Sequence, residues 1–156
     1  MTFASRLKSS LTLIVVTISA GAPTFAKDDV NCAWLSGNPD DVDLRSTLSH
    51  RVPDDVVLTC GTSRSIDGTT EQHCFATFPY RSDKAGEHFT RLSDELLGCL
   101  ALGESYLEDS PVNHPDSFVQ RLFDYGETSV SLSIKDKAAN SETLVFVKMS
   151  PTPPQK

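Results

Sequence analysis

The sequence predicts a single α+β domain in which one long helix, over about residues 83–102, packs on one face of a mostly antiparallel sheet of four to five strands. Stretches of alternating apolar and polar residues, typical of strands with one buried face, flank a stretch with apolar residues at helical spacing. Four cysteines behind an export signal add two expected disulfides. The 156 residues suit one domain of this kind.

Residues 1–26 have the pattern of a cleaved secretory signal peptide. Two basic residues precede an apolar run over 11–18, and small residues follow up to a cleavage site after Ala26, with an alternative site after Ala22. The run is much shorter than the roughly 20 residues that span a bilayer, so we expect no stable membrane insertion. The expected location is the periplasm or the outside of the cell.

The folded part is expected over residues 27–149 and begins with a short helix. Asn38 is a good N-cap, Pro39 suits the first helical position, and two acids follow in the first turn. We therefore predict a helix over 39–49, which ends before Pro53.

Residues 55–66 and 69–80 are predicted to form a β-hairpin, because apolar residues alternate along both arms and Asp67-Gly68 suits the turn. A two-residue loop would place Cys60 opposite Phe75. One more loop residue would place Cys60 and Cys74 face to face, and a bridge there would close a loop of about 15 residues, worth roughly 3 kcal/mol.

The four cysteines are Cys32, Cys60, Cys74 and Cys99, and no two have the Cys-x-x-Cys spacing of zinc ribbons or thioredoxin-type sites. Three disulfide connectivities are possible. We favour Cys60–Cys74 with Cys32–Cys99.

The long helix is predicted over 83–102, with Ser82 as its N-cap and Gly103 as its stop. Its apolar residues fall on one buried stripe: Phe89, Leu92, Leu96, Cys99 and Leu100. His88 is expected at the surface.

The remainder is expected to complete the sheet. A polar connection over 103–116 leads to strands at 117–124, 128–135 and 143–149, with a loop over 135–142. Residues 150–156 form a proline-rich tail that is expected to be disordered.

Candidate functional residues are few. Glu71 and His73 share the outer face of the predicted hairpin, where they would hold a metal or a water, although solvated strand residues are the commoner case. The 103–116 connection is longer than most loops, and long loops often bind partners. From it we select four candidate partner-binding residues: Tyr106, Asn113, His114 and Asp116.

The same connection offers oxygen and nitrogen ligands for a divalent cation, namely Glu104, Glu108, Asp109, His114 and Asp116. The favoured alternative is structural: two prolines stiffen an exposed turn and Asp116 supports the next strand.

The net charge and the motifs that do not occur narrow the classes of function that the sequence allows. The formal net charge is -7, and removal of residues 1–26 takes away two basic residues and no acid, which leaves -9. An acidic surface disfavours nucleic acid and attracts basic partners. No nucleophile elbow, phosphate loop or His-Glu-x-x-His motif occurs, so we assign no catalytic residue, metal or cofactor.

We therefore expect a small exported binding protein without enzymatic activity, most concretely a periplasmic inhibitor or immunity protein whose partner is another exported protein, such as a basic enzyme. Two alternatives remain open. One is an envelope-associated accessory protein that binds a ligand in a cavity between helix and sheet. The other is a small metal-dependent exported hydrolase that uses His114 with Asp116 or His73 with Glu71.

Overall fold

The computed structural model of the chain describes residues 32–35, 38–66, 68–100, 105–108 and 116–152. The predicted signal peptide lies outside them. The described residues contain, in chain order, η1 (Pro39–Asp41), α1 (Leu44–Ser49), β1 (Val57–Arg64), β2 (Thr70–Pro79), α2 (Asp83–Gly98), β3 (Ser105–Glu108), β4 (Phe118–Asp124), β5 (Thr128–Lys137), η2 (Ala138–Asn140) and β6 (Glu142–Pro151).

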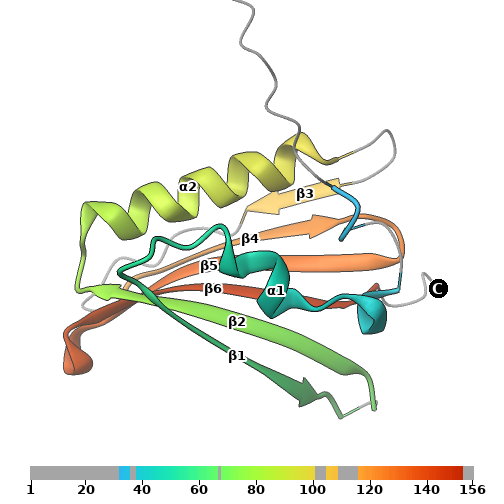
Figure 1. Cartoon of the computed structure of the whole chain (residues 1–156), viewed down its shortest axis with the longest axis horizontal. Helices are drawn as coiled ribbons and strands as arrows, with labels where there is room; N and C mark the ends of the chain where they lie inside the picture. Colours follow the sequence, from blue (N-terminus) through green and yellow to red (C-terminus); the bar gives the residue numbers. More distant parts are fainter. Residues whose placement is uncertain (1–31, 36–37, 67, 101–104, 109–115, 153–156) are drawn as a thin grey trace, which may run out of the picture.

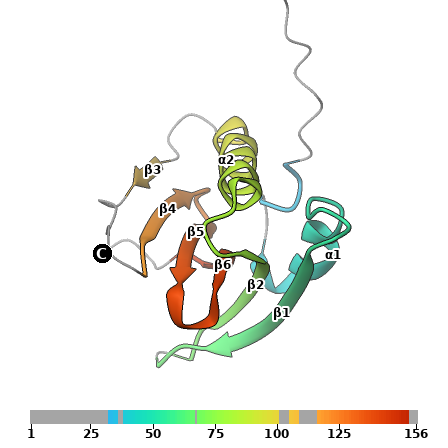
Figure 2. The same ribbon diagram turned by 90° about the vertical axis from the view of Figure 1, so that its left-hand side faces the viewer.

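The strands form one antiparallel sheet in the order β1-β2-β6-β5-β4-β3, and the long helix α2 lies across it (Figure 1). Figure 2 shows the sheet curving around α2, with α1 on the same concave side. The predicted α+β class is confirmed. The edge strand β3 is additional, since the sequence placed it inside a polar connection.

The core fills the space between α2, α1 and the concave face of the sheet. Alternate residues of β2, β5 and β6 point into it, and α2 contributes one stripe at helical spacing, as the sequence predicted. Its largest fully buried apolar side chains are Phe78, Phe123, Leu44, Leu132 and Met149.

The predicted helix over 39–49 is interrupted. The side chain of Asn38 accepts a hydrogen bond from the Asp40 N–H and starts only the 3-10 turn η1, after which Val42 is extended. Asp43 then caps α1 by accepting from the Ser46 N–H. The sequence contains two consecutive start signals, at Asn38 and Asp43, and each begins its own short element in place of the single predicted helix.

The long helix begins at its predicted cap, Ser82, and ends at Gly98, four residues before the predicted end. Cys99 closes the last turn and is bonded to Cys32. The Tyr125 hydroxyl donates a buried hydrogen bond of 2.7 Å to the carbonyl oxygen of Leu96, which fixes this end of α2 against the sheet.

The β1–β2 hairpin has the longer of the two loops considered. The Ser65 N–H donates to the Thr69 oxygen, and Gly68, at φ +89°, follows the turn. Cys60 is consequently opposite Cys74, and the two are bonded. Both favoured disulfides are confirmed.

Two strand boundaries differ from those predicted. β5 continues to Lys137, so only η2 and Ser141 separate it from β6. β6 continues to Pro151, which pairs with Thr128, so the first two residues of the predicted tail belong to the sheet.

A buried carboxylate fixes one end of the sheet. Asp136, 7% exposed, accepts hydrogen bonds from the side chains of Ser117 at 2.6 Å, Thr143 at 2.6 Å and Arg81 at 3.0 Å. Burial opposes the ionised form, but the hydroxyl and guanidinium donors outweigh it and lower the pKa of Asp136.

Candidate functional site

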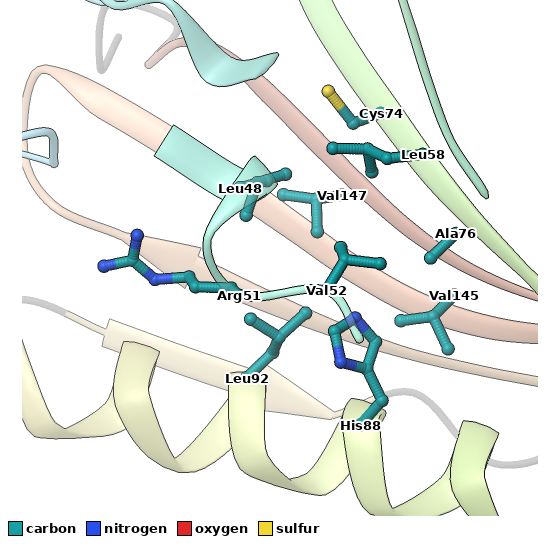
Figure 3. Close-up of a pocket in the computed structure, with 10 residues that line it drawn as sticks. All are labelled: Leu48, Arg51, Val52, Leu58, Cys74, Ala76, His88, Leu92, Val145 and Val147. Atoms are coloured by element: carbon teal, nitrogen blue, oxygen red, sulfur yellow. The ribbon is translucent and has the colours of Figure 1, made fainter. Parts of the chain in front are cut away.

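A small cavity lies between the concave face of the sheet, the segment after α1 and helix α2 (Figure 3). Its lining is mostly aliphatic, from Leu48, Val52, Leu92 and Val147 among others, and His88 is an exception. The cavity measures about 10 Å³. That volume holds a single water molecule at most.

His88 is only 4% exposed, so the expectation that it lies at the surface was wrong. Its ring packs against Phe78, with 5.4 Å between the ring centroids. Nδ1 is 3.0 Å from a guanidinium nitrogen of Arg91. Because a guanidinium only donates, Nδ1 accepts, and the proton of the neutral ring is on Nε2.

The position of His88 on α2 explains the error. The sequence around His88 indicates a polar first turn and a buried stripe that starts at Phe89, and His88 adjoins that stripe. Its ring faces a cavity that Leu48 of α1, which is 2% exposed, and Val52 also line.

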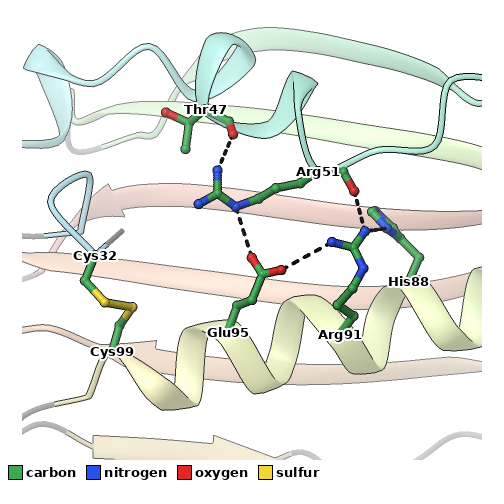
Figure 4. Close-up of polar contacts among 7 residues, drawn as sticks. All are labelled: Cys32, Thr47, Arg51, His88, Arg91, Glu95 and Cys99. Atoms are coloured by element: carbon green, nitrogen blue, oxygen red, sulfur yellow. Dashed lines mark hydrogen bonds and ion pairs between the residues drawn. A yellow bond between two sulfur atoms is a disulfide. The ribbon is translucent and has the colours of Figure 1, made fainter. Parts of the chain in front are cut away.

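Arg91 belongs to a network of charged groups that joins α2 to the segment after α1 (Figure 4). Glu95 accepts from Arg51 at 3.0 Å and from Arg91 at 3.2 Å. Arg51 also donates to the carbonyl of Thr47, and Arg91 donates to the carbonyl of Arg51. Of this network, Arg51 lines the cavity.

Burial, followed by the charge of Arg91, lowers the pKa of His88 from 6.5 to about 4. The ring is therefore neutral at physiological pH. It accepts a proton poorly, and in a cavity with room for one water it has no space for a substrate. In this position His88 has a structural role, because its ring accepts a hydrogen bond from Arg91.

The outer face of the sheet is built differently, because neither described helix covers it (Figure 2). His73 stacks on Phe146 at 5.7 Å between ring centroids, and Phe146 stacks on Phe75 at 6.1 Å. We call these three residues the aromatic row. All three are half-buried, so each retains some exposed surface.

The predicted placement of His73 and Glu71 on this outer face agrees with the structure, but the two side chains have different partners. Glu71 forms an ion pair with Lys148 at 3.1 Å, while the ring of His73 is in the aromatic row. Over the described residues, no group of three metal-ligating side chains occurs.

A groove of about 190 Å³ opens between the start of α1 and the β1–β2 hairpin. The Cys60–Cys74 disulfide, Thr62, Asp43 and Arg45 line it. The sequence carried no direct signal for this groove, because it depends on how α1 lies against the hairpin.

One side chain holds that arrangement in place. The Gln72 amide donates to the carbonyls of Pro39 and Val42 and accepts from the Leu44 N–H. These three bonds satisfy backbone groups exposed by the break between η1 and α1, and they hold the segment against β2.

Only some of the predicted partner-binding residues can be placed. Asn113 and His114 lie outside the described residues, and Tyr106 is in β3, opposite Phe123. Asp116 accepts from the Ala138 N–H at 3.0 Å, so its carboxylate supports the start of η2. The contact is structural, but it is made with η2 and not with the next strand, which the structural alternative had expected Asp116 to support.

No protein-family model matches the chain, and a search of curated proteins finds no significant relative. None of the helices that the structure describes is long and apolar enough to cross a membrane.

Proposed function

We propose that this protein is a small exported binding protein without enzymatic activity, most concretely a periplasmic inhibitor or immunity protein that acts on a partner enzyme. The observation that carries the proposal is the aromatic row on an outer sheet face that no described helix covers. Aromatic side chains are enriched at protein interfaces and supply much of their binding energy.

The cavity weighs against the ligand-binding alternative. Pockets for small molecules typically measure about 300–1,000 Å³. The space between helix and sheet measures about 10 Å³, and one of its lining residues, Arg51, is held by an ion pair with Glu95. Binding through the surface needs no such pocket.

Charge and covalent bracing support the same proposal. An acidic protein is attracted to basic partners, and electrostatic attraction increases the association rate. Two disulfides brace a small domain, so its surface is formed before a partner arrives and less ordering free energy is lost on binding.

The test is an affinity capture from periplasmic and secreted extracts with the oxidised mature protein as bait, in parallel with two variants. Phe146→Ser removes the central ring of the aromatic row. Leu97→Ser, the matched control, makes the same kind of change at an exposed apolar residue of α2.

We expect one stoichiometric enzyme partner with the wild type and with Leu97→Ser, and loss of that partner with Phe146→Ser. The captured enzyme should lose activity in a one-to-one titration. A wild-type bait that captures nothing at low and moderate salt would contradict the proposed function.

A further inference from the structure

β1 is a long edge strand with few of the features that usually protect such edges. It ends the sheet order, pairs with β2 along eight consecutive residues without a bulge, and contains no lysine, proline or acidic residue; its one charged residue is Arg64, at its last position. Unprotected edges are templates for pairing with another strand. The opposite edge strand, β3, has only four residues.

The hydrogen-bond pattern shows which backbone groups point outward. Ser65 and Thr69 form a hydrogen-bonded pair, and such pairs alternate along an antiparallel ladder. Gly61 and Ser63 therefore bond to β2, whereas the N–H and C=O groups of Cys60 and Thr62 point to the free edge.

Side-chain features surround the same edge. The groove at the start of α1 lies directly beside Cys60 and Thr62. Val57, the first residue of β1, and Ile66, in the loop two residues after its end, are 69% and 108% exposed and belong to the few large apolar side chains so exposed among the described residues. An added strand would lie beside this apolar surface and beside the groove.

The segment beside the groove carries net negative charge. Asp43 lines the groove, and Asp40 and Asp41 precede Asp43 in the segment that Gln72 holds in place. One oxygen of Asp43 caps α1, and a carboxylate has further acceptor capacity. Arg45 also lines the groove, so residues 40–45 carry three carboxylates and one guanidinium.

We propose that the β1 edge, with the adjoining groove, binds an extended segment of the partner protein that adds a seventh strand to the sheet and directs a lysine or arginine side chain to Asp43. The inference rests on the proposed binding function and specifies its surface. Main-chain hydrogen bonds supply the affinity and the groove supplies the specificity, as in other cases of strand addition. Thr59 of β1 is opposite Phe75, so the added strand extends the face that carries the aromatic row.

A second copy of this chain is a poorer occupant. Two edges from identical acidic proteins bring carboxylates of the same segment together, and like charges oppose such pairing. A basic segment would be attracted by the same carboxylates that repel a second copy.

The test uses a displayed library of linear ten-residue peptides, selected against the oxidised protein. We expect the enriched peptides to contain β-branched residues and a lysine or arginine. Binding of one enriched peptide is then measured by fluorescence anisotropy on three variants, Thr62→Pro, Thr62→Ala and Asp43→Asn.

Thr62→Pro removes an edge N–H without touching the bonds to β2, and it should weaken binding about tenfold or more. Thr62→Ala, the matched control, keeps the N–H and should stay within about threefold of the wild type. Asp43→Asn keeps a helix cap but removes the charge, and it should weaken binding and reduce its dependence on salt.

A peptide carrying N-methyl groups at the residues that face β1 gives a second test that is independent of protein folding, and it should not bind. The proposal is overturned if no peptide is enriched, if the enriched peptides are acidic, or if Thr62→Pro and N-methylation leave affinity unchanged. It is also overturned if sedimentation shows a dimer that Thr62→Pro abolishes. If Thr62→Pro captures a partner enzyme as well as the wild type does, the assignment of binding to the β1 edge is refuted, while the proposed function still stands.

Discussion

Replacement of His88 by glutamine tests whether the buried imidazole makes the protein sensitive to acid. An unfolded histidine takes up a proton near pH 6.5, whereas burial and Arg91 lower the pKa of His88 in the folded state to about 4. Between these values the unfolded state binds more protons than the folded state, so the free energy of unfolding falls as the pH drops through this window. Above the window, the contribution of His88 to stability is fully present. Glutamine keeps an acceptor for Arg91 and does not titrate.

The gap between the two pKa values corresponds to about 3 kcal/mol, most of which is lost between pH 7.5 and 4.5. Urea unfolding of the wild type and His88→Gln at both pH values, followed by far-UV circular dichroism, measures the difference. The wild type should lose about 2–3 kcal/mol more than the variant. His50→Gln, at an exposed histidine just after α1, is the control and should behave as the wild type. Equal losses in the wild type and His88→Gln would refute the reasoning.

Three further predictions concern stability. Replacing both Cys32 and Cys99 by serine opens the loop of sequence separation 67 and should lower the free energy of unfolding by about 4 kcal/mol, measured in urea. Asp136→Asn removes a buried charge that three donors satisfy, and we expect a loss of about 3 kcal/mol at pH 7. The difference from the wild type should shrink as the pH falls below 3.8, because the unfolded wild-type carboxyl then takes up a proton while the folded one, whose pKa is lower, stays ionised, so the wild type loses stability. Tyr125→Phe leaves the carbonyl of Leu96 without its buried donor and should lower the melting temperature by the equivalent of about 1 kcal/mol, with no change in the far-UV spectrum.

Much of the fold could be predicted because it depends on local patterns. Alternation along β2, β5 and β6 determined which residues face the core, and the stripe on α2 determined which side of the helix is buried. The disulfides followed from the hairpin register, since one loop residue decides whether Cys60 faces Cys74.

The features that were missed depend on contacts between distant segments. His88 is buried because its ring packs on Phe78 of β2 and faces the cavity that Leu48 and Val52 also line, and no local pattern around His88 contains that information. The break after η1 is stabilised by Gln72, about thirty residues further along the chain. The groove beside β1 results from the same contact, so sequence patterning pointed to other residues as candidates for binding.

The sheet order also constrains how the chain folds. β6, the last of the six strands in the sequence, lies between β2 and β5 and is the only bridge joining the β1–β2 hairpin to the β3–β4–β5 meander within the described sheet. The hairpin and the meander cannot join into one sheet until β6 is available. We therefore expect that a chain folding from its N-terminus first forms two separate, incomplete sheets. A chain that lacks β6 should therefore remain sensitive to proteases, and refolding should be governed by the slow closure of a contact between distant segments.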